Sequence, residues 1–303
     1  MTTRPKLLVS LPVGTHVYGD DPRGLIDLSR RVEGAGADGV VLADHVVLGA
    51  HVDRYPWGTF PFPSDAPWLE PLTMLTAIAT VTERIKLTTG ILIVPLRPAA
   101  LLAKMVATLD VLSGGRVELG VGTGWQEEEF TAQGIDPAQR GQILTDSIAA
   151  CRALWTDSPA HFASPSVSFD EVWSEPKPVR GGGPPVLFSG TLTKRNRTRI
   201  VELGDGWIPI MGETPEGIAA GVATLRAALA DAGRDPEQLI VRASLPLVRD
   251  GDAFSLAATI DGAGALAELG VTDVNLTFTV FVRDHDGVKP WFAELARRWG
   301  SAP

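Results

Sequence analysis

Eight short apolar runs alternate with segments of helical periodicity along the 303 residues, and this alternation limits the folds open to the chain. Most of the runs are continuously hydrophobic, which is typical of parallel strands buried on both faces. The helical segments have clear boundaries, such as Thr214 before Pro215 at a start and Ser113-Gly114 at an end. The predicted strands span Lys6–Val13, Asp38–Ala43, Ile85–Val94, Arg116–Gly122, Pro185–Ser189, Gly206–Ile210, Ile240–Leu247 and Asp273–Thr279.

Eight strand–helix pairs predict an α/β fold, a closed (β/α)8 TIM barrel. A doubly wound parallel sheet is the alternative, because the order of the strands cannot be read from the sequence. Barrels of this length commonly form one domain, and the composition does not change between the halves, so we expect a single domain over residues 1–303. Two long connections, about 45–68 and 156–184, are predicted insertions after strands 2 and 4, the second as a hairpin or extended arm.

Composition narrows the classes of partner. The net charge of -9 argues against nucleic acid or an anionic membrane surface, since both require a basic protein surface, and favours a small molecule. The single cysteine, Cys151, excludes an internal disulfide and lies among apolar residues, which predicts a buried thiol. The histidine spacing resembles no metal site, and no apolar stretch is long enough to cross a membrane, so we expect a cytoplasmic protein without a metal.

In such a barrel, the chemistry belongs at the carboxyl ends of the strands. Glycines at several of these ends would let a flat ligand approach the backbone closely. The predicted strand ends carry Asp44-His45 in the second strand, Gly90-Ile91 in the third, Gly122-Thr123-Gly124 in the fourth and Ser189-Gly190-Thr191 in the fifth.

Most of the chain resembles the luciferase-like monooxygenase family. The resemblance rests on these strand ends together with two further stretches, Glu83-Arg84-Ile85-Lys86-Leu87 and Leu203-Gly204-Asp205-Gly206-Trp207. The resemblance is to the branch that uses the deazaflavin coenzyme F420. It places Asp44 and His45 beside the reactive ring of the flavin or deazaflavin as catalytic residues, and an imidazole there suits proton delivery. The structural alternative for this pair is a capped helix entry.

The resemblance also implies cofactor contacts at the other strand ends. Gly90-Ile91 matches the place where relatives have a non-proline cis peptide bond behind the ring; otherwise Gly90 is a small residue in a crowded strand. Thr123 and Gly124 match contacts to the ring and its ribityl chain. The residues expected to bind the cofactor are Gly90, Ile91, Thr123, Gly124, Ser189, Gly190, Thr191 and Arg195.

Four cations crowd the start of the helix predicted after Thr191, namely Lys194, Arg195, Arg197 and Arg199. Cations at a helix N-terminus oppose the helix dipole, so the pattern suggests a nearby anion such as the cofactor phosphate. Arg195 is the residue we expect to contact it. Alternatively, these side chains point into water or pair with acids such as Glu202 or Asp205.

Trp125 marks a departure from the family pattern. Related F420-dependent sugar dehydrogenases have a glutamate directly after the Thr-Gly pair, so tryptophan argues against a sugar phosphate substrate. The acids that follow, residues 127–129, are interpreted as complementing the dipole of a first helical turn.

The connection at 45–68 contains five aromatic residues and is predicted to form a lid over the strand ends. Trp57 in this lid and Trp125 are the residues expected to line a pocket for a flat or hydrophobic substrate. The alternative is a loop that packs against the side of the barrel or against a neighbouring subunit.

The leading hypothesis is an F420-dependent oxidoreductase that transfers hydride between the deazaflavin and an apolar or aromatic organic substrate. The alternative is a two-component monooxygenase that receives FMNH2 from a separate reductase, because both cofactors share a tricyclic ring and a ribityl phosphate. A barrel that binds a flavin-like ligand without turnover is the third possibility. Dimers are common in related families, so we expect a homodimer.

Overall fold

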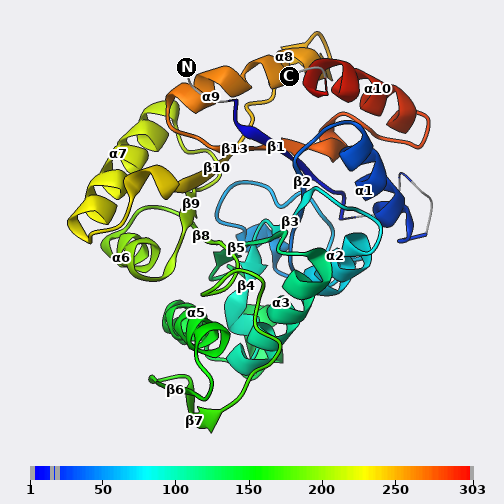
Figure 1. The fold of residues 1–303 in the computed structure, drawn as a ribbon. Helices are drawn as coiled ribbons and strands as arrows, with labels where there is room; N and C mark the ends of the chain where they lie inside the picture. The colour runs from blue at the N-terminus through cyan, green and yellow to red at the C-terminus, as the bar shows by residue number, and fades with distance from the viewer. Residues whose placement is uncertain (1–3, 14–16, 18–20, 301–303) are drawn as a thin grey trace.

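Eight parallel strands form a ring at the centre of the molecule (Figure 1). The computed structural model describes residues 4–13, 17 and 21–300. Buried Val, Leu and Ile side chains fill most positions of these strands, as expected for strands covered on both faces. The barrel strands are β1 (Lys6–Ser10), β2 (Gly39–Leu42), β3 (Lys86–Thr89), β5 (Val117–Gly122), β8 (Val186–Ser189), β9 (Gly206–Ile208), β10 (Ile240–Ser244) and β13 (Asp273–Thr277).

The ring closes through parallel pairing of every strand with two neighbours. β1 pairs with β2 and β13, and the pairing of β3 with β5 joins the two halves of the sheet, with Leu87 opposite Val117. This closure confirms the predicted (β/α)8 barrel and rules out the open, doubly wound sheet.

The third predicted strand is interrupted. Its first part is β3, and its last part is the short strand β4 (Leu92–Ile93), which pairs with β5 instead of continuing the β2 ladder. Gly90 and Ile91 lie between the two parts, and the peptide bond that joins them is cis, as the family resemblance implies. Several other strands also end earlier than predicted, since β1 stops at Ser10 and β10 at Ser244, and their continuations form loops at the barrel mouth.

Helices surround the barrel, with short 3-10 turns between them (Figure 1). Two predicted helix boundaries are confirmed. The Thr214 side chain caps the start of a helix by accepting a hydrogen bond from Gly217 N, and Gly114 ends another helix with φ +67. The helices are α1 (Gly24–Gly34), α2 (Pro71–Ala79), α3 (Ala99–Ser113), α4 (Glu127–Ala132), α5 (Arg140–Thr156), α6 (Lys194–Leu203), α7 (Pro215–Asp231), α8 (Leu256–Asp261), α9 (Ala263–Glu268) and α10 (Val288–Trp299). Within the described ranges, no helix has the length and apolar character needed to cross a bilayer.

The two long connections differ in structure. The one after β2 contains a single 3-10 turn, η1 (Val52–Arg54). The other contains an antiparallel hairpin of β6 (Ala160–Ala163) and β7 (Ser168–Val172), which extends away from the barrel after α5 (Figure 1). The expected hairpin is therefore present. A second small hairpin, β11 (Arg249–Asp250) with β12 (Ala253–Phe254), was not expected.

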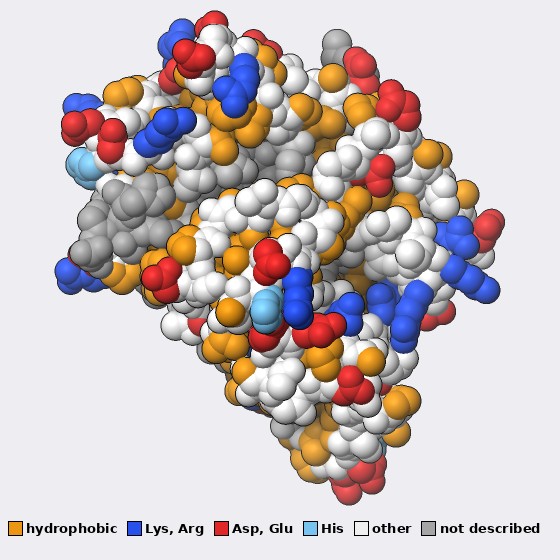
Figure 2. Space-filling view, turned by 180° about the vertical axis from the view of Figure 1, so that it is seen from behind, with side chains coloured by type: hydrophobic (Ala, Val, Ile, Leu, Met, Phe, Trp, Pro, Cys, Tyr) orange, Lys and Arg blue, Asp and Glu red, His pale blue; other side chains and the backbone are white. Residues whose placement is uncertain are grey.

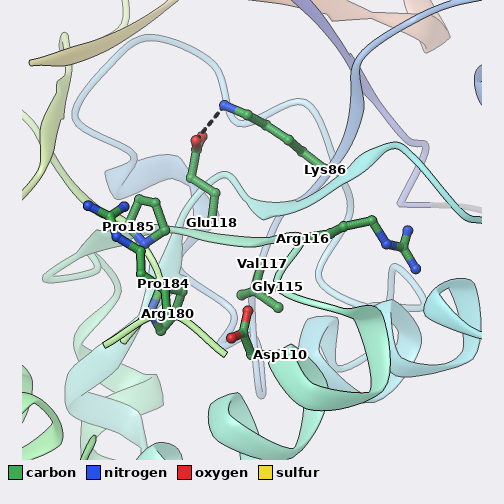
Figure 3. Close-up of a pocket in the computed structure, with 9 residues that line it drawn as sticks. All are labelled: Lys86, Asp110, Gly115, Arg116, Val117, Glu118, Arg180, Pro184 and Pro185. Atoms are coloured by element: carbon green, nitrogen blue, oxygen red, sulfur yellow. Dashed lines mark hydrogen bonds and ion pairs between the residues drawn. The ribbon is translucent and has the colours of Figure 1, made fainter. Parts of the chain in front are cut away.

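A layer of four charged residues crosses the barrel near the amino ends of its strands. Lys86 Nζ lies 2.6 Å from Glu118 Oε2 and 2.8 Å from Asp273 Oδ1, and Arg242 Nη1 lies 3.8 Å from Glu118 Oε1. A cavity of about 270 Å³ lies at this end of the barrel. Figure 3 shows Lys86 and Glu118, two of its lining residues, pointing toward one another. The candidate site lies at the opposite ends of the strands.

Candidate active site

The mouth of the barrel is lined by small residues at the carboxyl ends of the strands. Ser10, Ser189, Ser244 and Gly90 are partly or fully exposed, although the strands that lead to them are buried. Because no large side chain stands at these positions, a planar molecule can approach the backbone there.

Three glycines shape this mouth through their lack of a side chain. A Cβ at Gly90 would lie 2.3 Å from Val41 Cγ1, and one at Gly122 would lie 2.9 Å from Ile91 Cδ1. The Ile91 side chain therefore covers Gly122, so the third and fourth strand ends lie against each other. Gly124 has φ +72, and a Cβ there would lie 2.7 Å from Ile93, so its local packing also requires glycine.

His45 forms a buried pair with Glu129. Its Nδ1 lies 2.9 Å from Oε2 of Glu129, whose other oxygen accepts a 3.0 Å hydrogen bond from Val46 N. The imidazole is only 8% exposed and the carboxylate is fully buried. A carboxylate in this position accepts a hydrogen bond from Nδ1–H, which leaves Nε2 as the ring nitrogen open to a bound molecule.

All three acids at 127–129 lie in the first turn of α4, but their interpretation as dipole partners is incomplete for the last of them. Glu127 is exposed, but Glu129 is completely buried on the opposite side of α4 and bonds His45. Sequence reasoning missed this partner because it lies on another element. Its place directly before the buried Phe130 is the signal that could have indicated an inward-facing acid.

Asp44 is bound by its neighbours on both carboxylate oxygens. Arg97 Nη1 lies 2.7 Å from Oδ2 and Nη2 lies 2.9 Å from Oδ1, and Ile93 N donates to Oδ2 at 2.8 Å. Arg97 also reaches Glu70 Oε1 at 2.8 Å. This bidentate pair ties the end of β2 to the segment after β4.

Aromatic rings from the connection after β2, where a lid was predicted, and from the segment after β5 surround His45. The ring centroids of Trp68, Phe60 and Trp125 lie 4.6, 5.6 and 6.2 Å from that of His45. Tyr55 contacts Phe60 and Trp125, each at 5.2 Å, and burial raises the pKa of its hydroxyl. We call His45 and these four aromatic residues the aromatic enclosure.

The two predicted pocket residues lie at different depths in this arrangement. Trp125 contacts His45 directly, whereas Trp57 contacts Tyr55 at 5.3 Å and is 42% exposed at the edge. The connection after β2 is held by the N-cap residue of α4, because Gly49 N donates a hydrogen bond to Gln126 Oε1 at 2.9 Å. The Thr123 side chain is half-buried between these elements.

The turn after β8 is held in place by side chains that follow it. Asn196 Nδ2 donates to Ser189 O and Thr191 O, and Trp207 Nε1 donates to Gly190 O at 2.8 Å. The next helix, α6, begins after Thr193, whose hydroxyl accepts from Asn196 N at 3.2 Å. Ser189, Gly190 and Thr191 thus form one fixed turn before a helix N-terminus.

Arg195 is exposed, and its Nη2 donates to Gln142 Oε1 on α5 at 2.6 Å. Arg199 is buried and bonds Thr145 Oγ1 and Gly141 O on the same helix. The alternative expectation, an ion pair between Arg195 and Asp205, is not what the structure shows, because the Asp205 carboxylate pairs with Arg152 at 2.6 Å. Contact between Arg195 and a phosphate stays a prediction.

Residues 6–261 match the luciferase-like monooxygenase family. The uncharacterized protein Rv0953c of Mycobacterium tuberculosis is 36% identical over 206 residues, which cover 68% of each chain. The FMNH(2)-dependent dimethylsulfone monooxygenase of Pseudomonas putida is 29% identical over 240 residues, 73% of this chain and 65% of the relative.

Among solved structures, an F420-dependent secondary alcohol dehydrogenase in complex with an F420-acetone adduct superimposes with a TM-score of 0.72 and 17% identity. The superposition covers 96% of this chain and 98% of that one, and it establishes the shared fold. Because the family match extends over most of the closed barrel, this chain belongs to the luciferase-like monooxygenase family.

Proposed function

We propose that this protein is an F420-dependent oxidoreductase that acts on an apolar or aromatic organic substrate at the mouth of the barrel. The observation that supports this most is the His45–Glu129 pair inside the aromatic enclosure. A polar, proton-carrying side chain is surrounded there by rings that exclude water, and such an environment strengthens electrostatic interactions within a site.

The residues at the barrel mouth suit a planar tricyclic cofactor. Gly90 is exposed, and Ile91 lies over Gly122, so the third and fourth strand ends present backbone and one apolar side chain. The fixed turn at 189–191 and the N-terminus of α6 offer backbone amides for a phosphate. A deazaflavin or flavin supplies the redox chemistry when it is bound.

The chain's own residues orient the substrate and handle a proton. Glu129 accepts a hydrogen bond from Nδ1–H of His45 and would stabilise the charged imidazole, so that Nε2 can hold or release a proton. Asp44 acts indirectly, because Arg97 neutralises it and the pair fixes the backbone that carries His45. We therefore assign Asp44 a positioning role, while His45 is the catalytic residue.

The aromatic enclosure favours a neutral substrate. Its rings offer apolar faces and edges, and the nearby Arg97 is already paired with Asp44 and Glu70. A charged substrate would therefore lose hydration without gaining an ionic partner from Arg97. Trp125 and Trp57 would set the inner and outer limits of the pocket.

The surface near α6 favours F420 over FMN. Exposed basic side chains gather on this side of the molecule (Figure 2), and Lys194, Arg195 and Arg197 are exposed at the start of α6. The longer anionic tail of F420 would gain more from such a surface than FMN would. The similarity to an FMNH(2)-dependent monooxygenase supports the second candidate, a monooxygenase that depends on a separate reductase.

We also propose a homodimer. Helix α3 leaves Leu101 and Leu112 53% and 57% exposed on its outer face, which a second copy could cover. Light scattering on the purified protein tests this, and a monomer at micromolar concentration would contradict it.

The main test is a fluorescence titration with F420 and, separately, FMN at moderate salt, followed by an assay of turnover. Saturable F420 binding with much weaker FMN binding supports the F420 assignment, and the reverse order supports the FMNH2-dependent monooxygenase. Binding without turnover of any apolar substrate by either cofactor would instead favour a ligand-binding barrel.

A further inference from the structure

A buried arginine crosses the barrel below the candidate site. Arg242 on β10 is 0% exposed, and its Nη2 donates a 2.6 Å hydrogen bond to the backbone oxygen of Thr89 on β3. Among the residues that the structure describes, Nε and Nη1 of Arg242 have no hydrogen-bond partner. Burial of a guanidinium is costly unless its donors are used, so the single strong bond to Thr89 needs an explanation.

The carbonyl that Arg242 holds belongs to the peptide group directly before Gly90. On the other side of that peptide group, Gly90 N donates to Leu42 O on β2 at 2.7 Å. Both polar atoms of the Thr89–Gly90 peptide are therefore hydrogen-bonded, one to the β10 side chain and one to β2. These two bonds fix the peptide plane, and so they fix how Gly90 and Ile91 are presented at the mouth.

The absence of a side chain at Gly120 makes room for the contact between Arg242 and Thr89. A Cβ at position 120 would lie 2.0 Å from Arg242 Nη2 and 2.3 Å from Thr89 O. The hydroxyl of Thr89 donates to Gly120 O at 2.8 Å, which joins β3 to β5 at the same level. Glycine at 120 thus leaves the space through which the arginine reaches Thr89.

Charge balance alone does not account for the arrangement. Arg242 does complete a neutral set with Lys86, Glu118 and Asp273, but Lys86 already bonds both acids. A lysine at 242 would supply the same charge, but it is shorter and lacks the forked guanidinium whose Nη2 bonds the Thr89 carbonyl. The hydrogen bond to Thr89 O therefore depends on the length and the forked shape of the arginine side chain.

We propose that Arg242 is a positioning residue that holds the Thr89–Gly90 peptide, so that Gly90 and Ile91 form the surface against which the cofactor ring binds. The inference rests on the proposed function. Arg242 acts through Gly90 and is not itself a catalytic residue.

The Arg242→Lys variant keeps the positive charge but removes the guanidinium that bonds Thr89. Arg116→Lys is its control. Arg116 also bonds several backbone carbonyls, including Ala79 O and Thr82 O, but it does so at the end of α2, away from the mouth. The measurements are the melting temperature, hydrogen–deuterium exchange of peptides that cover β3 and β4, and the Kd for F420 and for FMN.

We expect both variants to melt earlier than the wild type. Only Arg242→Lys should speed exchange in β3 and β4 and weaken binding of the preferred cofactor, by about 10-fold for the loss of a bond from a charged donor. Wild-type exchange and Kd in Arg242→Lys would overturn the positioning role, as would an equal loss of affinity in Arg116→Lys. A wild-type protein that binds neither F420 nor FMN would overturn the proposed function, and this inference with it.

Discussion

His45 Nδ1 and Glu129 Oε2 lie 2.9 Å apart, although 84 residues separate them in the chain. The barrel brings them together because His45 follows β2 and Glu129 lies on α4, which follows β5 at the same end of the strands. Fixing Nδ1 as a donor to a buried carboxylate defines the tautomer of the ring and directs Nε2 to other partners.

Replacing His45 with alanine should reduce kcat by about 100- to 10,000-fold, the usual range for loss of a general acid or base. The affinity for the cofactor should change little, because the strand ends and the α6 turn remain. Steady-state kinetics and a fluorescence titration measure the two effects. His161→Ala on the exposed β6–β7 hairpin is the matched control and should retain full activity; unchanged turnover in His45→Ala would remove this residue from the mechanism.

Glu129→Gln should lower kcat by at least about 10-fold while the protein stays folded. The carboxylate accepts hydrogen bonds from both His45 and Val46, whereas a carboxamide has one acceptor oxygen and no charge to balance an imidazolium. Kinetics at several pH values and circular dichroism provide the readouts. The neighbouring Glu128→Gln is the control, since Glu128 is partly exposed and 4.0 Å from His51; equal losses in both variants would contradict a specific role for Glu129.

The barrel itself could be predicted because its signals are local. Continuous apolar runs, Thr214 as a cap and Gly114 as a stop each act within a few residues. The strand ends follow from the same pattern, so His45, Gly90 and Thr123 could be predicted to follow the carboxyl ends of their strands. One local prediction was wrong: the third strand was expected to be continuous, but it is interrupted at Gly90.

The partners of the candidate site could not be predicted because they depend on contacts between distant segments. Arg97 follows a proline-containing turn and gives no sign that it pairs with Asp44. Arg242 sits in a run that reads as an ordinary buried strand, and only closure of the barrel brings its guanidinium to Thr89. An acid or arginine inside an apolar run is the single sequence signal that such a contact leaves.

Glu70→Ala should lower the free energy of unfolding at pH 7 by about 1 kcal/mol, the typical effect of losing an N-cap acceptor. Burial raises the pKa of Glu70, but hydrogen bonds from Thr73 and Arg97 outweigh it and hold the pKa below 4.5. Its stabilising contribution is therefore present above pH 4.5 and is lost as the pH falls through the lower folded-state value.

Urea denaturation of the wild type and Glu70→Ala between pH 7 and pH 3 checks this. The difference between the two proteins should shrink at the acidic end. The exposed Glu268→Ala serves as the control and should stay close to the wild type throughout. A difference that grows on acidification would show that the ionised carboxylate is not the stabilising form.

Cys151 should resist thiol reagents in the native protein and react fully after unfolding. Its side chain is 0% exposed on α5, and burial raises the pKa of the thiol to about 12, so almost no thiolate is present at pH 8. Because the residue belongs to the main core, its labelling requires opening of the barrel and should follow global unfolding. Mass spectrometry after iodoacetamide treatment, with and without urea, measures the reaction. A Cys151→Ala protein that carries Ser64→Cys in the exposed loop is the positive control; native Cys151 labelling as fast as this surface thiol would mean that the core around α5 opens without unfolding of the barrel.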